Sequence, residues 1–196
     1  MRIIMSTETQ TFISPETYLA LEAQAEYKSE YRNGEIVAMA GAQLAHNQIV
    51  NNLIFLINRC LWDKDCQAFP SDLLLKMPER CNQYVYPDIT IVCGEVKVEK
   101  YKGLDVLLNP TVVIEILSSS TRTYDQSEKM ECYLALESLR QYIMVDSEKI
   151  EVASYTQTAE KDWLYQTLKS DQHQIKINDC EINLDEIYRN VKFVEQ

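Results

Sequence analysis

Apolar residues recur at helical spacing through residues 46–62, which makes this the strongest predicted helix of the chain. Its apolar positions are Ile49, Val50, Leu53, Leu56, Ile57, Cys60 and Leu61. A second helix is predicted to begin with Ser14 as N-cap and Pro15 at the first helical position, and to run to about Glu26. A third is predicted over residues 125–139, whose first residues have the spacing of a capping box.

Short runs rich in β-branched and aromatic residues predict strands between and after these helices. The predicted strands are residues 67–69, 72–77, 88–93, 111–117, 141–146 and 150–155. The run 111–117 has two valines and two isoleucines around one charge, which is typical of a strand buried on both faces. Asn33-Gly34, just before the apolar run 36–39, predicts a tight hairpin turn.

The order of helices and strands predicts an α/β (α+β) fold around one central mixed β-sheet flanked by helices. The chain has 196 residues and few glycines (4) and prolines (5), so we expect one domain over residues 1–196 without a long linker. Its core is expected over about residues 14–155. A strand-rich extension is expected over about 156–196, with a short helix at Leu184–Tyr188.

The composition of the chain indicates in which cellular compartment we expect the protein. Apolar residues make up 46% of the chain, yet no run is long enough for a membrane span, and Met1–Glu8 lacks the apolar run of a signal peptide. We therefore expect a cytoplasmic protein with no membrane partner. None of the six cysteines forms a C-x-x-C pair, which argues against a zinc knuckle, and in a reducing compartment we expect them to be free thiols packed like small hydrophobes.

Charge sets a constraint on partners. The formal net charge is −11 and the pI about 4.7, whereas nucleic-acid-binding proteins usually carry a basic footprint. A local basic groove, or metal ions bound in an acidic site, would reconcile an acidic chain with a phosphate substrate.

Three residues suggest a catalytic site. Glu115 lies in the middle of an apolar strand, where an unpaired carboxylate costs several kcal/mol, so it needs a metal ion, a lysine or a place on an edge strand open to solvent. Asp88 follows Pro87 and is expected at the mouth of a strand, although Pro-Asp is often a plain turn. Lys129, in the helix after the Glu115 strand, either folds back over that strand's end or lies in solvent. Two carboxylates and a lysine suit metal-assisted phosphodiester hydrolysis.

Several segments together resemble a known family. They are Tyr86-Pro87-Asp88-Ile89, Val113-Ile114-Glu115-Ile116-Leu117-Ser118 and Thr121-Arg122-Thr123-Tyr124-Asp125 with Lys129 and Tyr133. This pattern resembles the restriction-endonuclease-like proteins abundant in photosynthetic bacteria, members of the PD-(D/E)XK nuclease superfamily. The likeness covers roughly residues 14–155.

The resemblance implies a restriction-endonuclease-like fold and a metal-dependent DNA endonuclease that uses Mg²⁺, with Mn²⁺ able to substitute. Asp88 and Glu115 would then be metal ligands. The superfamily's lysine should stand where Leu117 does, and Lys129 fits the variants in which it has moved to the next helix. His46 and Glu35 match further family positions: His46 either caps or packs its helix or carries a proton near the metal, and Glu35 is either a surface residue or a third acidic ligand.

Two alternatives to a nuclease remain. A non-catalytic module of the same fold, binding nucleic acid or protein, would agree with the acidic surface and with Leu117 in place of the lysine. Hydrolysis of a sugar by paired carboxylates is the other, but no aromatic cluster beside the acids favours it. A nuclease that cuts both strands of a duplex needs two sites related by symmetry, so we expect a homodimer.

Overall fold

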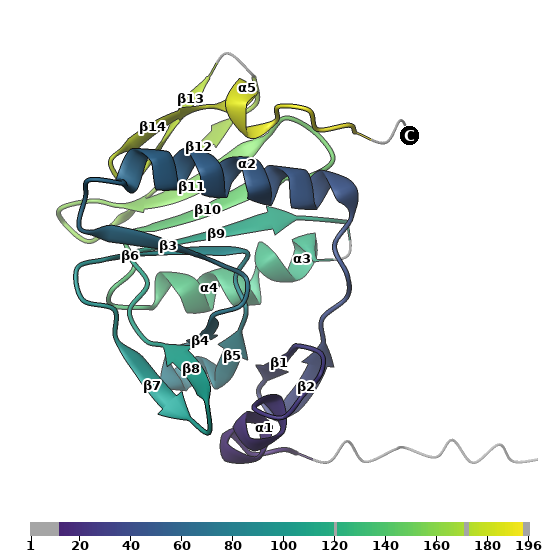
Figure 1. Cartoon of the computed structure of the whole chain (residues 1–196). Helices are drawn as coiled ribbons and strands as arrows, with labels where there is room; N and C mark the ends of the chain where they lie inside the picture. The colour runs from purple at the N-terminus through teal and green to yellow at the C-terminus, as the bar shows by residue number, and fades with distance from the viewer. Residues whose placement is uncertain (1–11, 120, 171–172, 194–196) are drawn as a thin grey trace, which may run out of the picture.

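The structure is a computed structural model that describes residues 12–119, 121–170 and 173–193. The N-terminal octapeptide, on which the predicted absence of a signal peptide rests, lies outside these residues. Within them the chain forms two six-stranded sheets and a two-stranded hairpin, together with helices (Figure 1). The predicted α/β (α+β) fold with a central mixed sheet flanked by helices is therefore confirmed. A second six-stranded sheet accompanies the central one, where only one sheet was expected.

The central sheet has the strand order β12-β11-β10-β9-β6-β3. Its strands are β3 (Cys66–Pro70), β6 (Ile89–Cys93), β9 (Val112–Leu117), β10 (Gln141–Asp146), β11 (Val152–Gln157) and β12 (Trp163–Leu168). β9 and β10 run parallel, and the other neighbours are antiparallel. Parallel neighbours need a crossover, which here contains α3 (Arg122–Asp125) and α4 (Glu128–Leu134). Five of these strands, β3, β6, β9, β10 and β11, confirm predicted ones to within two residues at each end.

The second sheet has the order β2-β1-β5-β4-β8-β7. Its strands are β1 (Ser29–Arg32), β2 (Glu35–Ala38), β4 (Leu74–Lys76), β5 (Gln83–Val85), β7 (Val98–Tyr101) and β8 (Leu104–Leu107). β1 and β2 form the predicted hairpin, and Asn33 and Gly34 at its turn have φ of 46° and 102°. β5, β7 and β8 have only three or four residues each, too few to show a period in the sequence.

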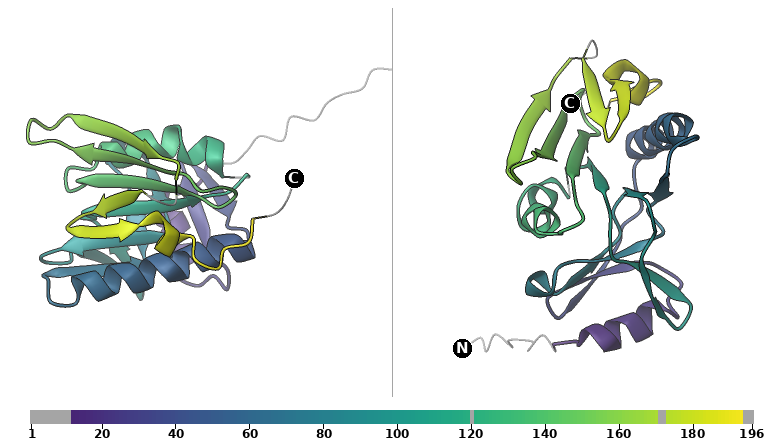
Figure 2. Two further views of the ribbon diagram at one scale, coloured as in Figure 1. Left: turned by 90° about the horizontal axis from the view of Figure 1, so that it is seen from above. Right: turned by 90° about the vertical axis from the view of Figure 1, so that its left-hand side faces the viewer.

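Helices cover both faces of the central sheet (Figure 2). α2 (Leu44–Leu61) lies on one face beside the hairpin of β13 (Gln174–Ile177) and β14 (Cys180–Asn183) and the short helix α5 (Leu184–Ile187). α4 lies on the other face. α1 (Pro15–Glu22) packs on the second sheet and ends four residues before the predicted end. No helix within the described ranges is long and apolar enough to cross a membrane.

The single helix predicted over residues 125–139 is wrong. The chain forms α3 and α4 instead, with a break at Gln126–Ser127. The Ser127 hydroxyl donates to the carbonyl oxygen of Thr123 at 2.6 Å, and a side chain that bonds the preceding turn in this way competes with helical geometry. Asp125 is thus the last residue of α3 and is buried, not the N-cap of a longer helix.

The expectation of free thiols is also wrong. The six cysteines form the disulfides Cys60–Cys180, Cys66–Cys93 and Cys81–Cys132. The partners are 120, 27 and 51 residues apart in sequence, so no local spacing of cysteines predicts the pairing. Cys66 and Cys93 face each other across β3 and β6, and Cys81–Cys132 ties α4 to the 3₁₀ turn η1 (Glu79–Cys81).

Candidate active site

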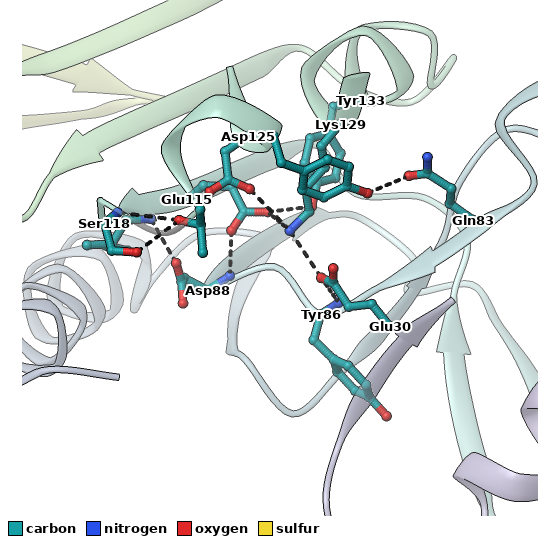
Figure 3. A network of polar contacts seen from close by, with 12 residues as sticks. Glu30, Gln83, Tyr86, Asp88, Glu115, Ser118, Asp125, Lys129 and Tyr133 are labelled. Carbon is teal, nitrogen blue, oxygen red and sulfur yellow. Dashed lines mark hydrogen bonds and ion pairs between the residues drawn. The ribbon is translucent and has the colours of Figure 1, made fainter. Parts of the chain in front are cut away.

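One cavity of about 920 Å³ is lined by residues from both sheets and from α2, α3 and α4. A polar network within it joins Glu30, Asp88, Glu115, Asp125 and Lys129 (Figure 3). The second sheet supplies Glu30, the central sheet supplies Glu115 and the residue before β6, and the crossover helices supply the other two. Residues far apart in the sequence therefore meet at one place.

Asp88 and Glu115 lie side by side because β6 and β9 are antiparallel. Ile89, the first residue of β6, pairs with Ile114, so Asp88 just before β6 lies beside Glu115, the residue that follows Ile114 in β9. The backbone N–H of Asp88 donates to Oε2 of Glu115 at 3.4 Å, and Oδ2 of Asp88 accepts from the N–H of Ile116 at 2.8 Å. The edge-strand explanation for Glu115 fails, since β9 lies between β10 and β6 and this side chain is buried.

Lys129 folds back over the strand, and the solvent-exposed alternative is wrong. The residue is 5% exposed, and its Nζ lies 2.9 Å from Oε1 of Glu115 and 3.1 Å from Oε1 of Glu30. Oδ1 of Asp125, one helical turn earlier, is 3.6 Å away. Burial alone would lower the pKa of Lys129, but these three carboxylates outweigh it and hold the pKa well above its usual value. The side chain is a fixed buried cation.

Glu115 stands in the most apolar surroundings of the cluster. Burial raises its pKa; Lys129 opposes the shift, and the nearby carboxylates of Asp125 and Asp88 add to it. The Tyr133 hydroxyl donates to Oε1 of Glu115 at 2.6 Å, and burial raises the pKa of Tyr133 so that it stays a donor. Negative charge on Glu115 is therefore only partly compensated by the protein.

The sequence prediction assigned no site role to Glu30 or Asp125. Glu30 also accepts from Arg32 at 2.7 Å, and although burial opposes it, Lys129 and Arg32 lower its pKa. The series Asp125, Lys129 and Tyr133, each four residues after the last, was a usable signal that three polar groups share one side. No such signal existed for Glu30, which meets Lys129 across 99 residues.

The two further family positions have different outcomes. His46, in the first turn of α2, lines the cavity, and its Nε2 lies 3.1 Å from Oδ1 of Asp88. Its Nδ1 is buried and has no hydrogen-bond partner within the described part of the chain. Glu35, by contrast, is not brought to the cavity: it is exposed at the start of β2, opposite Arg32. Glu30, on the partner strand of that hairpin, is the carboxylate that enters the cluster.

The donor set fits a hard divalent cation. Three carboxylates, those of Glu30, Glu115 and Asp125, lie within 4 Å of Nζ of Lys129, the carboxylate of Asp88 lines the same cavity, and Arg32 pairs with Glu30. Across the described ranges, no group of three or more His, Cys, Asp and Glu side chains is arranged to hold a metal by itself. Mg²⁺ usually takes one or two carboxylates and fills its other positions with water and phosphate oxygens, which Asp88 and Glu115 would allow.

The chain is similar to several known proteins. Two Synechocystis proteins, both described as uncharacterized, are 30% identical over 175 residues and 33% identical over 184 residues. The first match covers 89% of this chain and 98% of the relative, and the second covers 92% and 94%.

A crystal structure of an Anabaena variabilis protein, described as a putative nuclease belonging to DUF820, has the same fold, with a TM-score of 0.72 at 18% identity. That match covers 90% of this chain and 97% of the other. A family model described as "Uma2: Putative restriction endonuclease" matches residues 15–185, from the start of α1 to α5. The chain belongs to this Uma2 family of restriction-endonuclease-like proteins.

Proposed function

We propose that this cavity is the active site of a Mg²⁺-dependent endonuclease that hydrolyses phosphodiester bonds of DNA. One observation carries the proposal: the backbone N–H of Asp88 donates to the carboxylate of Glu115, and the buried Lys129 forms an ion pair with the same carboxylate. Membership of a restriction-endonuclease-like family supports the reaction class. Among polymers that such a family would cut, DNA is the substrate we propose.

Asp88 and Glu115 would hold the cation through carboxylate oxygens. When bound, Mg²⁺ supplies a Lewis acid for a phosphoryl oxygen and lowers the pKa of a coordinated water. Its charge would also balance the carboxylates that Lys129 and Arg32 leave uncompensated.

The chain's own groups would orient the reactants. The N–H of Ile116 fixes Oδ2 of Asp88, and the hydroxyl of Tyr133 fixes Oε1 of Glu115, so neither carboxylate is free to rotate. Lys129 places a permanent positive charge beside Glu115, where it would stabilise negative charge that develops on the phosphate. Nε2 of His46 lies 3.1 Å from Oδ1 of Asp88, and this imidazole would carry a proton near the bound metal.

A non-catalytic module of the same fold is the second candidate. The net charge of −11 favours it, since this chain lacks the cationic excess that carries most phosphate contacts. So does the engagement of Lys129 by three carboxylates, which leaves it less free to contact a substrate. This candidate predicts nucleic-acid or protein binding with no metal-dependent cleavage.

A plasmid-nicking assay with Mg²⁺ or Mn²⁺ separates the two candidates. The wild type should nick the plasmid, and Asp88→Ala and Glu115→Ala should each lower the rate at least about 100-fold, the scale of losing one preorganised charged group. Mn²⁺ binding, measured by calorimetry, should weaken in the same two variants. Asp105→Ala, which removes an exposed carboxylate of β8, is the matched control and should match the wild type.

Equal nicking by the wild type, Asp88→Ala and Glu115→Ala would place the activity elsewhere or in a contaminant. Absence of nicking with either metal, together with retained DNA binding, would favour the non-catalytic module.

A further inference from the structure

The cavity carries an uncharged wall as well as the acidic cluster. The lining includes Val37, Ala38, Met39, Ala40, Gly41 and Ala42, a continuous stretch without a charged side chain. Tyr27, in the turn before β1, lines the same cavity and is 83% exposed. Met39 is 37% exposed. An aromatic ring and a thioether thus lie open to whatever enters.

The charged residues that line the cavity leave few positive charges to bind a row of phosphates. It contains six carboxylates, those of Glu26, Glu30, Asp72, Asp88, Glu115 and Asp125, against three Lys and Arg side chains. Each of the three is already paired: Lys28 with Asp72 at 2.8 Å, Arg32 with Glu30 at 2.7 Å, and Lys129 with Glu115 at 2.9 Å. Duplex binding draws its affinity largely from unpaired cations that neutralise phosphates, and this lining has none to spare.

The size of the cavity is also a poor match for a duplex. A volume of about 920 Å³ lies within the range of about 300–1,000 Å³ that small-molecule pockets occupy. It suits one nucleotide, not a stacked duplex. Enzymes that work on a nucleotide in such a pocket act on single strands or take the nucleotide out of the stack.

We propose that the site takes single-stranded or locally unpaired DNA, with one base stacked on Tyr27 beside the uncharged stretch 37–42. The phosphate of that nucleotide then reaches Asp88 and Glu115. Base stacking on exposed aromatic rings tolerates any sequence and supplies affinity that does not come from cations. This inference rests on the proposed function and names its substrate class.

Binding of a fluorescent oligonucleotide tests the inference apart from cleavage. The full chain is titrated, with Ca²⁺ in place of Mg²⁺, with a 2-aminopurine oligonucleotide that is either single-stranded or annealed to its complement. The single strand should bind more tightly, and its fluorescence should be quenched by stacking. Tyr27→Ala should weaken binding of the single strand about 5- to 140-fold, which is the 1–3 kcal/mol of one stacked base converted at 1.4 kcal/mol per tenfold. Tyr27→Phe should keep the wild-type affinity.

Tyr165→Ala is the matched control, because Tyr165 is a 54% exposed tyrosine on β12 outside the cavity. It should bind as the wild type does. Salt should weaken binding only slightly, with a slope of log affinity against log salt of about −2 or shallower, since few phosphates are neutralised.

Equal or tighter binding of the duplex would overturn the inference, as would Tyr27→Ala with unchanged affinity for the single strand. Equal or tighter duplex binding, together with metal-dependent nicking that Asp88→Ala abolishes, would leave the proposed nuclease standing with a duplex substrate. Unchanged affinity of Tyr27→Ala, together with the same nicking, would leave the nuclease standing without the stacking site. Tight binding of the single strand without cleavage would instead sink the nuclease and keep the base-stacking site.

Discussion

The two faces of β9 are built from alternate residues of one strand and have opposite characters. Val112, Ile114 and Ile116 turn toward α2 and join a large apolar cluster that also includes the hairpin of β13 and β14. Val113 and Leu117 turn toward α4 and join a second apolar cluster. Glu115 occupies the position between those two, where the other face has isoleucine.

The comparison shows what a buried charge requires. A carboxylate in an apolar strand costs several kcal/mol unless it is paired and hydrogen-bonded. The α4 face meets that requirement with Lys129 and Tyr133, both within 3 Å of Oε1 of Glu115. The α2 face has no such cost and contributes its burial to stability directly. The α2 face therefore contributes apolar burial alone, whereas the α4 face combines apolar burial with the charged cluster that we propose as the active site.

Of the changes considered, removal of the buried positive charge of Lys129 is expected to have the largest effect on stability. Lys129→Met leaves Glu30, Glu115 and Asp125 facing one another without a buried cation, and should lower the free energy of unfolding by about 3–5 kcal/mol near neutral pH. Urea denaturation followed by circular dichroism measures it.

Lys100→Met, at a lysine of β7 whose side chain is 78% exposed, is the matched control and should change stability by less than about 0.5 kcal/mol. Adding Glu115→Leu to Lys129→Met should restore part of the loss, because it removes one of the unpaired carboxylates. A loss of under about 1 kcal/mol for Lys129→Met alone would show that Lys129 does not stabilise the folded state as an ion pair.

A change on the opposite face should separate stability from activity. Ile114 is fully buried against the α2 side, so Ile114→Ala should lower the free energy of unfolding by about 2–4 kcal/mol through lost burial and the cavity left behind. Ile114→Val should cost less, about 0.5–1.5 kcal/mol. Nicking per folded molecule should stay at the wild-type rate in both, and a fall in that rate at full folding would show that the two faces are coupled.

The sequence predicted the central sheet better than the site within it. β9 and β10 carry long apolar runs, and α2 carries a full amphipathic period, so their positions follow from pattern alone. The family resemblance implied that Asp88 and Glu115 act together, and the antiparallel pairing of β6 with β9 brings the two residues side by side. Glu30 did not follow, because it belongs to a four-residue strand of another sheet and its burial is set by tertiary contacts.

The predictions of free cysteines and of a single crossover helix were both wrong, each for its own physical reason. Disulfide partners separated by up to 120 residues depend on the final packing of elements, which no local spacing encodes. The break at Ser127 depends on where one hydroxyl points, and the capping-box spacing at residues 125 and 128 masked it. The disulfide error arises because the decisive contacts are distant in sequence, and the helix error because a side-chain hydrogen bond within one turn leaves no trace in the apolar period.

A second buried carboxylate on the α4 side of the sheet, that of Asp146, is expected to have the smallest effect on stability of these three positions. Asp146, at the end of β10, is 2% exposed and accepts from Arg122 of α3 at 2.7 and 3.1 Å. Burial alone would raise the pKa of Asp146, but hydrogen bonds from Arg122 and from the backbone of Glu148 outweigh it and lower the pKa. This ion pair does not line the cavity, so it should serve stability alone.

Because the folded-state pKa of Asp146 is lowered, its contribution is complete above the unfolded pKa of about 3.9 and is lost as the pH falls through the folded value. Asp146→Asn should therefore cost about 2 kcal/mol at pH 7, and the gap to the wild type should narrow below about pH 4. Urea denaturation across pH 3–8 measures this gap, with Asp105→Asn, at an exposed carboxylate of β8, as the control. A gap that does not depend on pH would show that the charge of Asp146 does not stabilise the folded state and that the loss in Asp146→Asn has another cause.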